Sequence, residues 1–248
     1  MAQTKPSIAA KRSKPTPTAE SRSPPQAAQP RRRARGRPAA GGDPDLREHL
    51  LDAAIQRFSR NGVAATSLRA IAGDAHATPA MLHYYFGDKP QLLDALVAER
   101  LLPVVAAIHA PLLDGETTDA PALVRTFVQS MMRIIEANPW LPSLWVREVL
   151  NEDGAFRDVL VETVGPKVPR LLAMRLHAMR DAGQWPPGVE PNLLVGSVIG
   201  LTMFAAASAP LWSRIFDAPL TTAQIERHAL ALLDAAMRPS NPAQEQSA

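Results

Sequence analysis

Apolar residues recur at helical spacing along most of the chain, from Pro44 almost to the C-terminus. In the first segment they fall on one helical face, at Leu46, Leu50, Leu51, Ala54, Ile55 and Phe58. Similar segments follow at 66–73, 78–85, 89–109, 121–137, 143–150, 155–164, 167–182, 191–208 and 221–237. Glycine and proline separate them, with Pro111 and Pro210 among the predicted breaks, and no segment alternates apolar and polar residues as a half-buried strand does. The sequence therefore predicts an all-α fold.

The first 42 residues differ from the rest of the chain. They are rich in proline, alanine, serine and arginine and lack apolar periodicity, which predicts a disordered arm. They carry ten Lys or Arg against the single acid Glu20, a net charge of +9, whereas the whole chain has a net charge of +3. A basic arm on an acidic body favours a polyanionic partner, and a solubilising or unprocessed tail is the alternative. Residues 239–248 are predicted to form a second disordered tail.

Several classes of chemistry are excluded by residue content. The chain has no cysteine, which excludes disulfides, thiolate metal sites and cysteine nucleophiles. The six histidines are scattered without the spacing of metal ligands, so no metal site is predicted. We find no glycine-rich phosphate loop, serine nucleophile elbow or pair of catalytic carboxylates. We therefore expect no enzyme activity and no cofactor. Because residues 1–45 lack the apolar stretch of a secretory signal, we expect a cytoplasmic protein.

One long segment, Asn192 to Ser213, contains no charged residue and is long enough to suggest a membrane span. Against a membrane span, it contains Gly196, Gly200 and Pro210 and lacks an aromatic belt with flanking basic residues. A helix buried in a core or in an interface is therefore the preferred interpretation.

Two short helical segments follow the first predicted helix and are joined by a tight connection. Thr66 is placed to cap the first of them, and Thr78 to cap the second, with Pro79 at its first helical position. Leu82 and Phe86 lie four positions apart, so they share a face that we expect to be buried. Two short helices with this connection are typical of a helix-turn-helix, whose second helix enters the DNA major groove.

A longer pattern of about 50 residues surrounds these two helices. It consists of Ala53, Ala54, Phe58, Gly62, Thr66, Ser67, Ile71, Ala72, Ala75, Leu82, Tyr85, Phe86, Asp88, Lys89, Leu92 and Leu93. In order and spacing the pattern resembles the TetR/AcrR family of bacterial repressors. It departs from the family at His76-Ala77, which replace the usual Gly-Val of the turn, at Ala80, which replaces a glycine, and at His83, where tyrosine is common.

The resemblance implies a helix-turn-helix DNA-binding domain at 43–90, followed by a larger helical effector-binding and dimerisation domain at 91–238. Carried over position by position, it implies DNA contacts from Thr66, Thr78, Pro79, Ala80, His83, Tyr84, Tyr85 and Lys89. Thr66 and Lys89 would lie at helix N-termini, where backbone N–H groups and the helix dipole favour a phosphate. For Tyr85 a half-buried position against the first helix is the alternative, and for His83 a solvated surface position.

The basic arm contains a second candidate DNA contact. The segment Arg35-Gly36-Arg37-Pro38 resembles the core of an AT-hook, in which arginines enter a narrow A·T-rich minor groove. Arg35 and Arg37 are therefore candidate minor-groove contacts, and a general attraction to phosphate is the alternative.

Large, soft side chains recur in the predicted helical domain. Such residues line adaptable apolar pockets, although more often they simply form the core. The candidate ligand contacts are Phe127, Met131, Trp145, Met174, His177 and Phe204. His177 has the alternative of a packing residue on an apolar helix. Arg147 and Glu148 are either polar groups of the ligand site or part of a solvated helix face.

The predicted function is a sequence-specific DNA-binding transcriptional regulator. The resemblance favours a homodimeric repressor that a small apolar effector releases from a double-stranded DNA operator, with no membrane partner. An effector-independent architectural or co-regulatory DNA-binding protein is the alternative, although DNA binding alone would not need so large a second domain. The dimer interface is expected near 191–208 and 221–237, where Gly196 and Gly200 permit a close approach of two helices.

Overall fold

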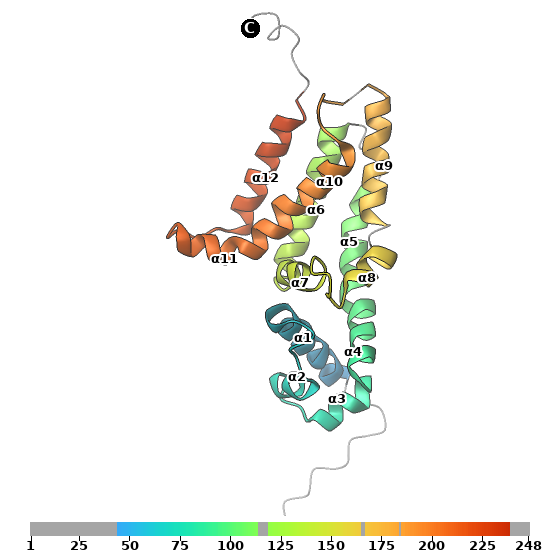
Figure 1. Ribbon diagram of the computed structural model, residues 1–248, viewed down its shortest axis with the longest axis vertical. Helices are drawn as coiled ribbons and strands as arrows, with labels where there is room; N and C mark the ends of the chain where they lie inside the picture. Colours follow the sequence, from blue (N-terminus) through green and yellow to red (C-terminus); the bar gives the residue numbers. More distant parts are fainter. Residues whose placement is uncertain (1–43, 114–118, 165–166, 184, 239–248) are drawn as a thin grey trace, which may run out of the picture. The chain divides into compact units, whose positions relative to one another are not determined.

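The computed structural model describes residues 44–113, 119–164, 167–183 and 185–238. The arm at 1–42, with Arg35 and Arg37, and the tail at 239–248 lie outside the described residues. Within the described ranges every regular element is a helix (Figure 1), which confirms the all-α prediction. The elements are α1 (Pro44–Asn61), α2 (Leu68–Asp74), α3 (Pro79–Phe86), α4 (Lys89–Leu96), η1 (Val97–Leu101), α5 (Leu102–Leu113), α6 (Ala120–Ala137), α7 (Leu141–Glu148), α8 (Arg157–Val159), η2 (Leu160–Val164), α9 (Val168–Asp181), α10 (Pro191–Ile199), η3 (Gly200–Phe204), α11 (Ala205–Ile215) and α12 (Thr222–Ala236).

The first helices share a tightly packed core. Eight of their large side chains are no more than 1% exposed: Leu50, Leu51, Ile55, Phe58, Ile71, Leu82, Leu92 and Leu96. Burying one such side chain contributes roughly 1.5–3 kcal/mol to folding. Leu82 and Phe86, at 0% and 4% exposure, confirm the predicted buried face of α3. This core fixes α2 and α3 against α1 and against the start of α4.

Two long helices each contain a π-helical segment. α4, η1 and α5 form the continuous helix Lys89–Leu113, and α10, η3 and α11 form Pro191–Ile215. Pro111 and Pro210 lie inside these helices, so the breaks predicted at both prolines are wrong. Each proline removes one backbone donor. After Pro111 the buried face continues at Leu112, so there tertiary packing outweighs the local propensity. The residues that follow Pro210 in its helix are not buried, and nothing in the packing explains why that helix continues.

The remaining helices surround α6. Its buried face packs against α5 on one side and α12 on another, and α9 packs against α5 and α10. The predicted domain boundary between residues 90 and 91 falls within the continuous helix Lys89–Leu113. This helix therefore connects the first helices, α1 to α3, with the helices that surround α6 (Figure 1).

Both long helices are apolar enough, by length and composition alone, to cross a membrane. The mean hydropathy of the most apolar stretch is 1.6 in Lys89–Leu113 and 1.8 in Pro191–Ile215. In Pro191–Ile215 only 33% of the most apolar stretch is buried inside the protomer. Leu193, Phe204 and Leu211 are exposed on this helix. The described part of the chain thus leaves an apolar face of Pro191–Ile215 uncovered.

Candidate nucleic-acid interface and apolar pocket

The start of α2 differs from the prediction. The N-cap is Ser67, whose Oγ accepts a hydrogen bond from Ala70 N at 3.2 Å. Thr66 is only 4% exposed, and its hydroxyl donates to Gly62 O at 2.7 Å. The capping role expected of Thr66 is therefore wrong, because the helix begins one residue later than the periodicity suggested. The Thr66 side chain is therefore buried, whereas Ser67 is exposed.

The recognition helix α3 begins as predicted. Thr78 is its N-cap, with the hydroxyl accepting from Met81 N at 3.3 Å, and Pro79 lies in the first turn. Thr78, Pro79, Ala80, His83 and Tyr84 are all exposed. The candidate contact residues of α3 are therefore all accessible. The His83 ring is held in place by Gly87, the residue that follows α3, because the His83 Nδ1–H donates to Gly87 O at 2.5 Å.

The two neighbouring tyrosines have different surroundings. Tyr84 is 64% exposed, whereas Tyr85 is half-buried and packs against the hydrophobic core. Their rings meet edge to face, with centroids 5.2 Å apart and an interplanar angle of 78°. Tyr85 is thus half-buried, as in the alternative interpretation, and Tyr84 is the more exposed of the two side chains.

Lys89, at the start of α4, is partly buried and faces the connection between α1 and α2. Its Nζ donates to Thr66 O at 2.8 Å and to Val63 O. An ammonium group has three donors, so one remains for a phosphate. Asp88 caps α4, with Oδ1 accepting from Gln91 N at 3.0 Å.

Ion pairs join α1 to the π-helical segment η1. Arg47 donates to both carboxylate oxygens of Glu99, one of them at 2.6 Å, and its guanidinium lies 5.0 Å from the centre of the Phe86 ring. Arg100 donates to Asp52 and to Glu48, each at 2.8 Å. The hydrogen bond from Arg47 lowers the pKa of Glu99, and the same bond raises the pKa of Arg47. These pairs attach α1 to the long helix Lys89–Leu113.

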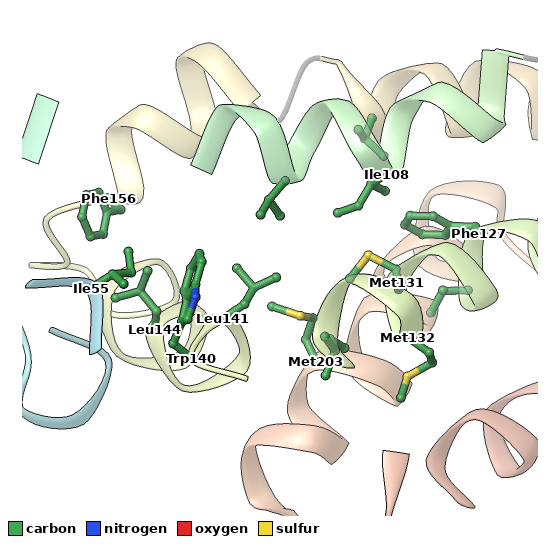
Figure 2. Close-up of a cluster of buried hydrophobic side chains, with 14 of the residues drawn as sticks. Ile55, Ile108, Phe127, Met131, Met132, Trp140, Leu141, Leu144, Phe156 and Met203 are labelled. Atoms are coloured by element: carbon green, nitrogen blue, oxygen red, sulfur yellow. The ribbon is translucent and has the colours of Figure 1, made fainter. Parts of the chain in front are cut away.

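An apolar pocket lies among α5, α6, α7, α9 and η3, with a volume of about 900 Å³ that is partly open to solvent. Figure 2 shows several of the buried side chains around it. Its lining consists of Leu101, Val104, Val105, Ile108, Phe127, Met131, Leu141, Leu144, Trp145, Val149, Phe156, Val159, Leu160, Val168, Pro169, Ile199 and Met203. Among the described residues, none with a charged side chain lines it.

Three of the six candidate ligand residues line this pocket: Phe127, Met131 and Trp145. The other three do not. Met174 is 62% exposed, because Leu172 and Leu176 occupy the inward face of α9. Phe204 is 57% exposed, because its neighbour Met203 takes the inward position. His177 donates from Nε2 to Asn192 Oδ1 at 3.1 Å and so links α9 to α10.

Most of the pocket lining was not predicted, because it consists of ordinary aliphatic residues that differ from other core residues in no visible way. Both interpretations predicted for Glu148 are also wrong. It is neither a polar group in the pocket nor part of a solvated face, since it is 6% exposed and accepts hydrogen bonds from two backbone N–H groups. No group of three or more potential metal-ligating side chains occurs in the ranges that the structure covers.

Comparison with known proteins decides the family. A family model described as "Bacterial regulatory proteins, tetR family" matches residues 50–96. The transcriptional regulator BetI of Brucella anthropi is 32% identical over 144 residues, which cover 57% of this chain and 68% of BetI. The chain belongs to the TetR family.

Other TetR-family relatives match a shorter region. The nicotine-responsive transcriptional repressor HdnoR of Paenarthrobacter nicotinovorans is 44% identical over 64 residues, which cover 26% of this chain and 33% of HdnoR. The chain thus matches about a third of the length of HdnoR, and the same holds for BetI of Rhizobium meliloti, at 32% of that protein. Sequence similarity to these two is confined to a segment of 64 residues in each case.

Solved structures share the fold of this TetR-family regulator. PfmR of Thermus thermophilus has a TM-score of 0.59 and 20% identity, covering 79% of this chain and 97% of PfmR. The SmeT–triclosan complex has a TM-score of 0.54 and 21% identity, covering 77% of this chain and 91% of SmeT. The N-terminal helix-turn-helix and the helical C-terminal domain are therefore the arrangement of known TetR-family structures.

Proposed function

We propose that this TetR-family regulator is a homodimeric repressor that binds an operator through α3 and is released when a small apolar molecule fills the pocket. The observation that carries the proposal is the pocket itself, whose described lining is wholly apolar. An apolar pocket favours an apolar ligand, because transferring the ligand's apolar surface out of water is favourable. HdnoR, nicotine-responsive by name, and SmeT, solved with triclosan, support a small-molecule effector.

DNA contacts are proposed for the exposed residues of the helix-turn-helix. The first turn of α3 would enter the major groove, with Thr78, Pro79 and Ala80 nearest the bases. His83, Tyr84 and Tyr85 would follow along the same helix. Lys89 would offer its third N–H donor to a phosphate while its other two hold the α1–α2 connection.

The basic arm is proposed to add affinity. Arg35 and Arg37 would bind the minor groove beside the operator, while the other cations of the arm attract phosphates. Deleting residues 1–40 should lower operator affinity most at low salt. Equal affinities of the deleted and full-length proteins at every salt concentration would contradict a role in DNA binding.

Dimerisation is proposed through the uncovered apolar face of Pro191–Ile215 together with α12. Gly196, Gly200 and Phe204 are exposed on that helix, and Leu232 is exposed on α12. A second copy would cover this face and place two copies of α3 on a two-fold symmetric operator. We propose that a second copy of the chain, and not a bilayer, covers this face, and that the protein is cytoplasmic. We also propose that the protein is a regulator and not an enzyme.

The test is operator binding with and without candidate effectors. DNA sites are selected from a random duplex library with the full-length protein, and affinity is measured by fluorescence anisotropy. A two-fold symmetric site whose affinity falls when uncharged apolar compounds bind supports the proposal. Binding of such compounds without any change in DNA affinity favours the effector-independent alternative, and the absence of a selected site contradicts operator recognition.

A further inference from the structure

Glu148, the last residue of α7, accepts two hydrogen bonds from distant parts of the backbone. Its Oε1 accepts from Val63 N at 2.9 Å, across 85 residues of sequence, and its Oε2 accepts from Ala155 N at 3.1 Å. The side chain is buried, and a buried polar group that loses its hydrogen-bond partner is costly. Val63 lies between α1 and α2, so one carboxylate joins the DNA-reading helices to the helices that hold the pocket.

On one side, Glu148 is attached to the wall of the pocket. Leu144 and Trp145, one turn earlier on α7, line the pocket, and so does Phe156, whose N–H donates to Glu148 O at 3.1 Å. Figure 2 shows Leu144 and Phe156 at the end of the pocket nearest Ile55 of α1, and α1 packs against α7. A displacement of this wall therefore displaces the Glu148 carboxylate.

On the other side, the Val63 peptide lies where α1, α2 and α4 meet. Its N–H donates to Glu148, while its carbonyl accepts from Lys89 Nζ at the start of α4. Lys89 also donates to Thr66 O, and Thr66 directly precedes the N-cap of α2. A shift of the Val63 backbone is thus transmitted to Thr66, just before the N-cap of α2, and to Lys89, the first residue of α4.

The end of α7 lies close to this connection at Gly62. Gly62 has φ of +85°, a conformation that favours glycine, and a Cβ there would lie 3.1 Å from Glu148 Oε1 and 3.3 Å from Arg147 Cδ. Because α7 and the α1–α2 connection are in close contact, a displacement of α7 would change both this packing and the Glu148–Val63 hydrogen bond.

We propose that Glu148 is a positioning residue that transmits displacement of the pocket wall to α2 and α3 through the Val63 peptide. The inference rests on the proposed function in taking the pocket as the effector site. A ligand changes DNA affinity only through unequal affinity for two arrangements of the protein. The Glu148–Val63 bond belongs to the arrangement with the pocket unfilled, and occupation of the pocket weakens it.

The experiment compares full-length wild type with Glu148→Leu and with Glu152→Leu, the same change at an exposed position four residues later. The pocket is filled in two ways: with the uncharged apolar dye Nile red, and with Val105→Trp, a substitution in the lining on α5. The readout is hydrogen exchange of the α2 and α3 amides by mass spectrometry. Thermal unfolding confirms that each variant is folded.

We expect filling the pocket to change exchange in α2 and α3 of wild type and Glu152→Leu by about 5- to 10-fold, a typical coupling between linked sites. In Glu148→Leu that change should be lost, and Nile red should bind with a lower Kd than to wild type, because its binding no longer weakens the Glu148–Val63 bond. Glu148→Gln keeps an oxygen for Val63 N but loses an acceptor for Ala155 N, and should retain part of the response. It serves as the test if Glu148→Leu does not fold.

The inference is overturned if Glu148→Leu, or Glu148→Gln in its place, responds like wild type, which would assign the coupling to Lys89–Leu113 alone. It is also overturned if neither way of filling the pocket changes exchange in wild type. A wild type whose exchange responds while its operator affinity does not would leave the role of Glu148 intact and contradict the proposed effector release.

Discussion

At the scale of single residues, the turn of the helix-turn-helix contains a backbone conformation that its side chain does not favour. His76 has φ of +52°, in the left-handed region, at a position where the resemblance to the family implies glycine. The next residue, Ala77, donates to Ala72 O at 2.8 Å, and this bond holds the turn in place. A residue with a Cβ costs about 1–2 kcal/mol in this region, so the sharp turn between α2 and α3 is formed against local strain.

Replacing His76 with glycine should therefore stabilise the protein. The relief of strain is partly offset by the greater entropy of glycine in the unfolded chain, so we expect a gain of about 0.5–1 kcal/mol in unfolding free energy. Urea denaturation measures the gain. His49→Gly, inside α1, is the control and should lose about 0.5 kcal/mol. A loss of stability in His76→Gly would show that contacts of the imidazole stabilise the fold by more than the backbone strain at His76 destabilises it.

The Arg47–Glu99 pair predicts a dependence of stability on pH. Arg47 holds the pKa of Glu99 below its ordinary value of 4.5, so the pair stabilises the fold fully above that value and less as the pH falls through the lowered pKa. Glu99→Gln should lose about 0.5–1 kcal/mol at pH 7, a modest effect because both side chains are about a third exposed. Near pH 3 the difference from wild type should shrink. An equal difference at both pH values would contradict this assignment.

At the scale of elements, the residues of α3 that stabilise the fold and those proposed to contact DNA lie on different faces of the helix. Leu82 and Phe86 are buried against α1 and α2, whereas His83 and Tyr84, on the intervening positions, are exposed. The helix has only eight residues, so it depends on packing and on its Thr78 cap rather than on intrinsic helix propensity. Substitutions on the two faces should therefore affect different measurements.

Tyr84→Ala should weaken operator binding by roughly 1–3 kcal/mol, the cost of one oriented contact, without a change in thermal stability. Leu82→Ala should instead lower the unfolding free energy by roughly 2–5 kcal/mol, because it leaves a cavity in the core. Anisotropy titrations and thermal unfolding of both variants separate the two effects. The assignment of faces is wrong if Tyr84→Ala unfolds the domain or Leu82→Ala leaves its stability unchanged.

At the scale of the whole molecule, Pro191–Ile215 presents more apolar surface than one protomer covers. Trp212 and Phe216, near its C-terminal end, stack with centroids 5.6 Å apart and are both exposed. Together with Leu193, Phe204 and Leu211 they extend the uncovered face along the full helix. An exposed apolar surface of this kind is typical of a site of association between proteins.

Gly200→Leu should weaken the dimer and, with it, operator binding. A Cβ at Gly200 would meet nothing within 4 Å in the protomer, so the substitution leaves the protomer fold intact and acts on the proposed partner surface. Sedimentation at micromolar concentration should show a monomer–dimer shift relative to wild type. Ala178→Leu, on the exposed surface of α9, should not change the oligomeric state. A fully dimeric Gly200→Leu protein would place the interface elsewhere.

Local spacing along the sequence was enough to predict the all-α fold, the capping role of Thr78 and the buried face of α3, because these features depend on residues within four positions of one another. It misplaced the start of α2 and the breaks at Pro111 and Pro210. Tertiary structure alone decided which residues of the apolar helices face the pocket. Met203 and Phe204 are neighbours of similar character, and only packing against α6 and α7 turns one inward and the other outward. Glu148 depends on tertiary structure for the same reason: a buried carboxylate is satisfied by donors wherever the fold brings them, and Val63 is 85 residues away.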